Sequence, residues 1–249
     1  MIPIPLSTTR GNPAQKARAR PAEVVPCSDC SLRDVCMPSD LTPSDLERVD
    51  ALICGSRKVA RGDTLYRTGD DFQNIYAIKA GAFKTVVTLR DGREQITGFQ
   101  IAGEPLGMEG VHAGEHTSDA VALEDSLLCI IPFGRLERLC SDIRVMQRHL
   151  HRLMSGEIVR KSQLLAMLGS MRAEERVSAF LINLSERLRA RRCSDTDLKL
   201  RMSREEIGSY LGMTLETVSR MLSRFHDEEL IAVRGKLVRI LDAERLQQI

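Results

Sequence analysis

The periodicity of the sequence changes at Pro132. From residue 57 to 132, short runs of alternating apolar and polar residues are separated by glycine-containing turns. Such alternation is typical of half-buried β-strands, and many short strands with regular turns favour a small antiparallel roll or barrel. After Pro132 the apolar residues recur every three or four positions, which is the period of an α-helix. We therefore predict an α+β chain in which an antiparallel β-roll is followed by helices.

An Asp91-Gly92 pair stands between two of the alternating runs. Asp-Gly flanked by alternating apolar residues is among the strongest short-range signals of a β-hairpin. We predict that the chain reverses at these two residues and that the flanking runs pair as antiparallel strands.

Residues 142–170 are predicted to form one long helix, because their apolar residues recur at helical spacing without an intervening proline. A small β-roll cannot cover such a stripe alone, so we expect a coiled-coil-like homodimer. The residues expected at this interface are Leu150, Met154, Ile158, Lys161 and Leu165. Glu157 interrupts the stripe one turn before Lys161. The pattern leaves open whether these two pair with each other, pair across the interface or only flank it.

The sequence after residue 170 predicts a winged helix-turn-helix. Ser203 and Glu206 have the spacing of a capping box, which opens a short helix. Gly212 ends that helix, and Thr214 is a suitable N-cap for the next one. Two short alternating runs on either side of Gly235 then predict a β-hairpin beside the helices.

The second of these helices, residues 214–226, separates into two faces. The apolar face, expected to be buried, consists of Val218, Met221, Leu222 and Phe225. The opposite face carries Glu216, Ser219 and Arg220 in the N-terminal half, which is the part of a recognition helix that enters the major groove. Arg220 can donate to guanine O6 and N7, Glu216 can accept from the cytosine amino group, and Ser219 can contact a base edge or the backbone. The alternative is a polar face without function, but the capped helix and the glycine turn before it favour DNA reading.

Seven cysteines occur in the chain, and three of them lie close together as Cys27, Cys30 and Cys36. The N-terminal sequence lacks the apolar stretch of a secretory signal, so we expect a cytoplasmic protein whose thiols stay reduced. This expectation favours a metal site over a disulfide framework. A tetrahedral thiolate site needs four ligands, and zinc and iron–sulfur clusters both fit such a set. The spacing does not choose the fourth ligand among Cys54, Cys129, Cys140 and Cys193.

Other classes of function are disfavoured. No apolar run is long enough to span a bilayer, so we expect no membrane association. No histidine or carboxylate motif accompanies any of the cysteines, so we do not expect an enzyme. The net charge of +2 gives no global sign of nucleic-acid binding, and the expectation of DNA binding rests on the recognition helix.

Taken together, the motifs resemble the FNR branch of the CRP/FNR transcription regulators. The resemblance covers about residues 25–245 and rests on the cysteines together with YAIKAG, EQITGF, RLMSGEI, AEERVSAFLINLS and IGSYLGMTLETVSRML. It implies a [4Fe–4S] cluster with four ligands, which are Cys27, Cys30, Cys36 and Cys129. It assigns structural roles to the remaining cysteines, Cys54, Cys140 and Cys193. In this family the intact cluster favours a dimer, and oxygen converts the cluster and releases the dimer.

The resemblance also implies the partners. Glu216, Ser219 and Arg220 match the base-reading residues of the family, which implies double-stranded DNA with palindromic TTGAT-type half-sites. The hairpin loop near Asp91 and Gly92 resembles a surface that contacts RNA polymerase. The implied protein is a global regulator of anaerobic metabolism that activates or represses transcription. A DNA-binding regulator with a structural four-cysteine zinc site and no oxygen sensing is the alternative.

The sequence departs from the wider superfamily at the cyclic-nucleotide site. In the regulator CRP an arginine of the roll neutralises the phosphate of cyclic AMP, whereas Ser118 and Asp119 occupy the corresponding stretch here. A carboxylate would repel the phosphate, so we expect no cyclic nucleotide.

These inferences divide the chain into four segments. We expect residues 1–24 to lack fixed structure and residues 25–141 to form a cluster-binding loop and a β-roll sensor domain. Residues 142–170 are expected to form the dimerisation helix and residues 171–249 the winged helix-turn-helix DNA-binding domain.

Overall fold

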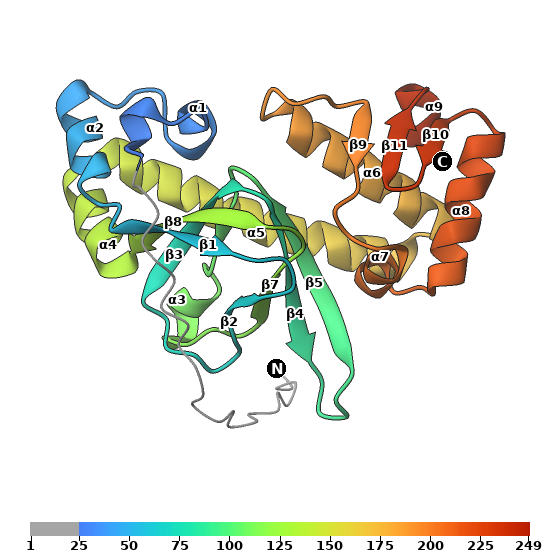
Figure 1. The fold of residues 1–249 in the computed structure, drawn as a ribbon, viewed down its shortest axis with the longest axis horizontal. Coiled ribbons are helices and arrows are strands. Elements are labelled where there is room, and N and C mark those ends of the chain that lie inside the picture. The colour runs from blue at the N-terminus through green and yellow to red at the C-terminus, as the bar shows by residue number, and fades with distance from the viewer. Residues whose placement is uncertain (1–24) are drawn as a thin grey trace. The chain divides into compact units, whose positions relative to one another are not determined.

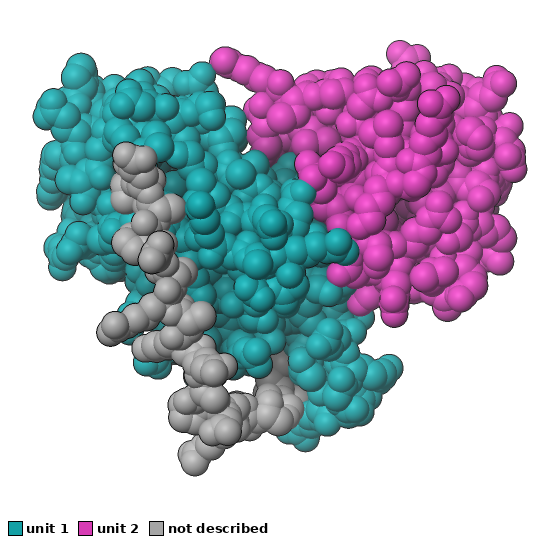
Figure 2. Space-filling view, in the orientation of Figure 1, with its two compact units in different colours: residues 1–155 teal, residues 156–249 magenta. Residues whose placement is uncertain are grey.

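The computed structural model describes residues 25–249, which fold into two compact units. The first unit ends at Ser155, and the second spans Gly156–Ile249 (Figure 2). The division falls inside the long helix α5 (Arg144–Ser170), which therefore contributes to both units. The expectation for residues 1–24 lies outside the described residues. No helix in the described part of the chain is both long and apolar enough to cross a membrane.

The first unit contains two four-stranded sheets (Figure 1). The first sheet has the order β1-β8-β3-β6, with bounds Gly55–Val59, Ser126–Pro132, Asn74–Ala80 and Pro105–Leu106. The second has the order β2-β7-β4-β5, with bounds Thr64–Tyr66, Asp119–Ala122, Ala82–Thr88 and Glu94–Ile101. Neighbouring strands are antiparallel in both sheets, which confirms the predicted antiparallel roll.

The β4–β5 hairpin reverses at the predicted Asp91-Gly92 pair. Leu89 N donates to Arg93 O at 2.8 Å, and Gly92 N donates to Leu89 O at 3.0 Å. Gly92 has a φ of 83°, a left-handed conformation that glycine adopts without a Cβ clash. The loop therefore has its glycine in the left-handed position, and its residues form the exposed end of a long hairpin (Figure 1).

Strand β8 separates two hydrophobic cores, because successive side chains of a strand point to opposite faces. Cys129 and Ile131 pack in a core shared with helices of the first unit. Leu128 and Ile130 pack in the core that fills the roll. The neighbouring strand β3 shows the same alternation. The first sheet thus has a helical face and an interior face, and Cys129 lies on the helical face.

The helices of the first unit that precede α5 are short. Their bounds are Cys27–Asp29 (3-10 helix η1), Arg33–Cys36 (α1), Pro43–Asp50 (α2), Gly110–Ala113 (α3) and Phe133–Asp142 (α4). Apolar side chains of α2, α4 and the start of α5 cover the helical face of the sheet. An Arg48–Asp142 ion pair joins α2 to the end of α4 at the surface.

The second unit is a winged helix-turn-helix, as predicted (Figure 1). Its helices are Ala173–Arg189 (α6), Arg204–Leu211 (α7), Leu215–Asp227 (α8) and Ala243–Gln247 (α9). Its sheet has the order β10-β11-β9, with bounds Ile231–Arg234, Leu237–Ile240 and Asp197–Lys199. The sequence predicted the β10–β11 hairpin but not β9, which is too short to show a period of its own.

The predicted helix caps are present in the second unit. Ser203 Oγ accepts from Glu206 N at 3.0 Å, and Glu206 Oε2 accepts from Ser203 N at 2.7 Å, which completes the capping box. Thr214 Oγ1 accepts from Thr217 N at 3.3 Å at the start of α8. Gly212 ends α7 with a φ of 63°, so the turn between the two helices uses the left-handed conformation.

Candidate metal centre and DNA-reading surface

Cys129 is held by the first sheet. It lies in β8, where it is paired with Ser56 of β1 and Ala77 of β3. Its side chain is half-buried and packs on the helical face of the sheet. Because β8 is paired on both sides, the backbone at Cys129 is held firmly. This position can therefore anchor a ligand set whose other members lie on a loop.

The three N-terminal cysteines lie on a segment of tight turns before α2. Cys30 N donates to Cys27 O at 3.2 Å, and Cys36 is the last residue of α1. Ser28 N donates to Asp50 Oδ1 at 3.2 Å, which ties the start of the segment to α2. We call residues 27–36 the cysteine loop.

The structure brings the four predicted ligands into one neighbourhood. Cys27 is buried, and both Cys36 and Cys129 pack against the core that contains it. Burial raises the pKa of Cys27 to about 12, and the negative charge of neighbouring cysteines in their thiolate form, Cys129 first among them, acts in the same direction. Cys30 acts on the pKa of Cys129 as well. These electrostatic effects agree with the packing of Cys27, Cys36 and Cys129 around one core.

The four thiols do not form a closed ligand set. Within residues 25–249, no group of three or more His, Cys, Asp or Glu side chains is arranged to hold a metal ion. The donor set nevertheless fits zinc or an iron–sulfur cluster, because both accept four cysteine sulfurs. Binding would require the cysteine loop to close towards Cys129, which stays on its strand.

The remaining cysteines are placed differently. Cys140 belongs to the same hydrophobic core as Cys129, so burial alone does not separate the two candidates. Burial raises the pKa of Cys140, and the negative charge of Glu137 adds to this effect. Cys129, in contrast, raises the pKa of Cys27. Cys54 is exposed and accepts a hydrogen bond from Arg135 Nη1 at 3.2 Å. Cys193 is exposed and belongs to the second unit.

Three residues near the cysteines were not identified from the sequence. The negative charge of Asp50 acts on Cys27, and the positive charge of Lys79 lowers the pKa of Cys129 against the larger effect of burial. His149 Nε2 lies 3.0 Å from the carbonyl oxygen of Cys36, and burial lowers the pKa of this imidazole. Their proximity arises only on folding, and no local spacing marks it in the sequence.

Aromatic side chains pack inside the roll around Tyr66 and His116. Tyr66 stacks on His116 with ring centroids 3.6 Å apart and an interplanar angle of 11°. His116 is buried, and its Nδ1 lies 3.2 Å from Glu109 Oε1. Asp119 Oδ1 accepts a hydrogen bond from Thr68 N at 2.8 Å, so this carboxylate supports the backbone of the roll.

Helix α8 has the two faces that its sequence predicted. The buried face consists of Val218, Met221, Leu222 and Phe225. On the opposite side Glu216 and Arg220 are exposed and Ser219 is half-buried. Hydrogen bonds from the Glu216 amide and the Thr214 hydroxyl lower the pKa of the Glu216 carboxyl, so this side chain is available as an ionised acceptor. The structure therefore places the three predicted base-reading residues on one accessible helix surface.

Arg224, one turn after Arg220, has a different environment. It forms ion pairs with Glu174 of α6 and with Glu228. The Glu174 pair links α8 to α6, so we assign Arg224 to the packing of the recognition helix and not to base reading.

Apolar residues of α5 are exposed to solvent in the single chain. Ile158 is 67% exposed and Leu165 is 71% exposed. Lys161 is also exposed, and Met154 is half-buried. These four residues follow each other at spacings of four, three and four and therefore share one side of the helix. We call them the α5 stripe.

Leu150 and Glu157 have contacts within the single chain. Leu150 is partly buried and packs against the core of the first unit. Glu157 forms an ion pair with Arg160 on the same helix. The α5 stripe therefore begins at Met154.

The predicted polymerase-contact residues lie at the exposed end of the β4–β5 hairpin. Asp91 Oδ2 accepts a hydrogen bond from Arg93 Nε at 2.7 Å. Hydrogen bonds from Arg93 hold the pKa of Asp91 below its usual value. With Gly92, these residues present a fixed polar turn to solvent.

Two family models match the chain. Residues 56–143 match the cyclic nucleotide-binding domain, and residues 175–249 match the Crp-like helix-turn-helix domain. The first match covers the roll and the second covers most of the second compact unit.

Relatives that match along most of the chain are transcription regulators. The chain is 44% identical over 223 residues to the transcriptional regulatory protein btr of Bordetella pertussis, covering 90% of this chain and 92% of that protein. It is 41% identical to the transcriptional activator protein anr of Pseudomonas aeruginosa, with coverages of 94% and 96%. It is 39% identical to the fumarate and nitrate reduction regulatory protein of Escherichia coli K12, with coverages of 90% and 89%. Among solved structures, FixK2 from Bradyrhizobium japonicum superimposes with a TM-score of 0.71 at 29% identity, covering 78% of this chain and 95% of FixK2.

Proposed function

Because the chain belongs to the FNR/Anr branch of the CRP/FNR family of transcription regulators, we propose that it senses oxygen through a [4Fe–4S] cluster. The chain is a DNA-binding regulator and not an enzyme, and the helix-turn-helix of its second unit contacts DNA. One relative is named for fumarate and nitrate reduction, which supports a global role in anaerobic metabolism for this chain.

The observation that carries the proposal is the position of Cys129 beside the cysteine loop. Cys129 lies on a paired strand, packs against the core that contains Cys27 and acts on the pKa of Cys27. When bound, the cluster would supply an oxygen-labile link between the four thiolates. Cys129 would hold the fixed end of this link, and the cysteine loop would hold the movable end.

Ligand binding would order the cysteine loop. The thiols are near one another but not closed around a centre, so closure of the loop and binding would occur together. Part of the binding free energy would therefore stabilise one position of the loop against α2 and α5.

The α5 stripe supports a homodimer. Ile158 and Leu165 are large apolar side chains that remain mostly exposed in one chain. A second copy of α5 would cover them in the manner of a coiled coil, with Lys161 at the same seam. We propose that the cluster-bound form favours this dimer.

A dimer matches a palindromic operator. It presents two α8 helices to two half-sites, whereas a monomer presents one and binds weakly. We propose TTGAT-type half-sites, with Arg220 donating to a guanine and Glu216 accepting from a cytosine amino group. Ser219 would contact a base edge or the backbone.

Two further partners follow from the first unit. We propose that the exposed turn at Asp91 and Gly92 contacts RNA polymerase. We propose no cyclic nucleotide partner, because Asp119 would repel its phosphate and the Tyr66 ring, stacked on the buried His116, packs inside the roll.

The test is the metal content of protein purified without oxygen. We expect a brown protein that contains iron and acid-labile sulfide, about four of each per chain, and that bleaches in air. A colourless protein with one zinc per chain would replace the oxygen sensor with a structural zinc site. Iron without sulfide would also contradict the proposal.

A further inference from the structure

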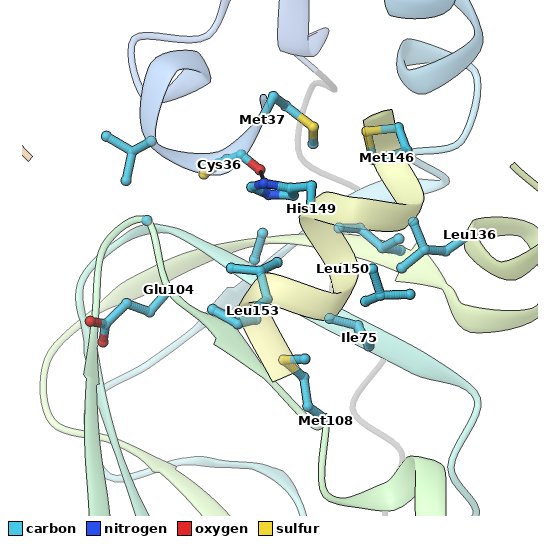
Figure 3. Close-up of a pocket in the computed structure, with 15 residues that line it drawn as sticks. Cys36, Met37, Ile75, Glu104, Met108, Leu136, Met146, His149, Leu150 and Leu153 are labelled. Carbon is cyan, nitrogen blue, oxygen red and sulfur yellow. Dashed lines mark hydrogen bonds between the residues drawn. The ribbon is translucent and has the colours of Figure 1, made fainter. Parts of the chain in front are cut away.

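A hydrogen bond connects the cysteine loop to α5. His149 Nε2 lies 3.0 Å from the carbonyl oxygen of Cys36, a residue 113 positions away in the sequence. Because a carbonyl can only accept, Nε2 carries the proton and His149 is the donor. Figure 3 shows the imidazole reaching from α5 to this carbonyl.

The acceptor is a group that needs a partner. Cys36 is the last residue of α1. The carbonyls of the last helical turn receive no hydrogen bond from an N–H of the same helix, so they accept from groups outside it. The imidazole of His149 is partly buried, so the bond is shielded from competing water. The bond therefore fixes the end of the cysteine loop relative to α5.

The other end of the cysteine loop is tied elsewhere. Ser28 N donates to Asp50 on α2, and α2 is joined to α4 through the Arg48–Asp142 ion pair. The loop is thus held between two attachments, of which the His149 attachment lies on α5.

Side-chain packing between the end of the cysteine loop and α5 is incomplete. An apolar pocket of about 60 Å³ lies there, lined by Met37 from the loop side and by Met146, Leu150 and Leu153 from α5 (Figure 3). A void forfeits dispersion contacts, and methionine side chains adapt to small displacements. The loop can therefore shift against α5 at low packing cost, and the directional hydrogen bond determines its position.

We propose that His149 is the positioning residue that couples the state of the cysteine loop to the dimer helix. This inference rests on the proposed function. His149 precedes Met154, the first residue of the α5 stripe, by five positions on the same helix. The bond is present although the four thiols are not closed around a centre, so it joins the loop to the helix before and after closure. When the loop closes around a bound group, the Cys36 carbonyl would carry His149 with it and thereby shift the start of α5. When the group is lost, the loop and the start of α5 would return to the arrangement described here.

Three variants test the proposal on the full chain assembled without oxygen. His149→Leu places an apolar side chain in the partly buried position and removes the donor, whereas His149→Gln retains an N–H that can reach the carbonyl. His151→Leu is the matched control, because His151 is an exposed histidine on the same helix. Iron, sulfide and the visible spectrum report loading, and sedimentation reports the dimer dissociation constant.

We expect all variants to load iron and sulfide as the parent chain does. The dimer dissociation constant of His149→Leu should rise by about fivefold or more, which is the lower end of typical coupling between sites. His149→Gln should recover most of the dimer, and His151→Leu should match the parent. In the metal-free chain, hydrogen exchange at residues 33–37 should be faster in His149→Leu than in His151→Leu, which tests the attachment without a loaded cluster.

A fully loaded His149→Leu chain that dimerises like the parent would overturn the proposal. Loss of loading in His149→Leu alone would also overturn it, because His149 would then serve ligand binding and not coupling. A parent chain that takes up no iron, or does not dimerise when loaded, would instead contradict the proposed function.

Discussion

At the scale of single residues, the main question is whether Cys129 or Cys140 is the fourth ligand, because both pack in the hydrophobic core that contains Cys27. Cys129 acts on the pKa of Cys27, whereas the electrostatic partner of Cys140 is Glu137. Cys129→Ala should therefore lose most of its iron and sulfide when purified without oxygen. Replacing any one of the loop cysteines, Cys27, Cys30 or Cys36, should have the same effect.

The controls are the other three cysteines. Cys140→Ala, Cys54→Ala and Cys193→Ala should retain the visible spectrum and metal content of the parent chain. Full loading of Cys129→Ala, measured as iron per chain, would show that the fourth ligand has been misassigned. Loss of loading in Cys140→Ala with retained folding would point to Cys140 in its place.

Arg220 is predicted to read a base and not the DNA backbone. Its side chain is exposed in the N-terminal half of α8, whereas Arg224 is held in ion pairs. Arg220→Ala should lose about 1–3 kcal/mol of preference at one base pair of each half-site, measured by binding to operators changed at single positions. Equal weakening on every operator, with a shallower salt dependence, would mean that Arg220 contacts phosphate.

At the scale of elements, the α5 stripe is predicted to form the dimer interface. Ile158→Glu or Leu165→Glu should raise the dimer dissociation constant of the loaded protein about thirtyfold or more, because a central apolar contact is replaced by a charge. Both side chains are exposed in the single chain, so the fold of each unit should persist. Sedimentation of the loaded protein measures the effect.

Val159 provides the matched control for this interface. It is 53% exposed and next to Ile158 in sequence, but it lies on a different side of the helix from the α5 stripe. Val159→Glu should leave the dimer intact. Equal loss of the dimer in all three variants would argue against a defined stripe.

The turn between α7 and α8 depends on a close backbone approach at Gly208. A Cβ at this position would lie 2.6 Å from the carbonyl oxygen of Met213, so one of the two segments would have to move. Gly208→Ala should destabilise the second unit by about 1–3 kcal/mol in denaturant unfolding, as overpacking does.

Gly169 is the comparison for Gly208. A Cβ there meets no atom within 4 Å, so Gly169→Ala should stabilise α5 by about 0.5–1 kcal/mol. A neutral Gly208→Ala variant that binds its operator normally would contradict the close approach.

The elements could be predicted from the sequence where their signals are local. The alternation before Pro132, the capping box at Ser203 and the glycine turn at Gly212 each depend on neighbouring residues, and the structure confirms them. The strand β9 was missed because three residues carry no period. Leu150 fits the apolar spacing of α5, but its packing against the core depends on how the first unit folds, which spacing does not encode.

The candidate metal centre could be predicted only in part from local sequence patterns. The spacing of the three loop cysteines predicts a metal site. Cys129 is distant from them in sequence and was identified through family resemblance. Its place on the helical face of β8 arises from strand pairing. The bond from His149 to Cys36 likewise connects residues 113 positions apart, so only the folded chain reveals it.

At the scale of the whole molecule, the proposed function requires that the state of the cysteine loop changes the dimer equilibrium. The two compact units share α5, and the α5 stripe and His149 lie on that helix. A shift of about 1–3 kcal/mol in dimerisation, typical of coupling between sites, changes the dissociation constant about 5- to 150-fold. Operator occupancy then changes with it, because a palindromic site needs both recognition helices.

The most direct measurement of this coupling is sedimentation of one sample before and after exposure to air, with the visible spectrum recorded alongside and the protein held near its dimer dissociation constant. We predict a brown, predominantly dimeric protein without oxygen, and loss of colour together with a shift to monomer in air. A sample that bleaches completely and keeps its dimer would contradict the coupling, and a sample that never carries the iron–sulfur absorption would contradict the sensor itself.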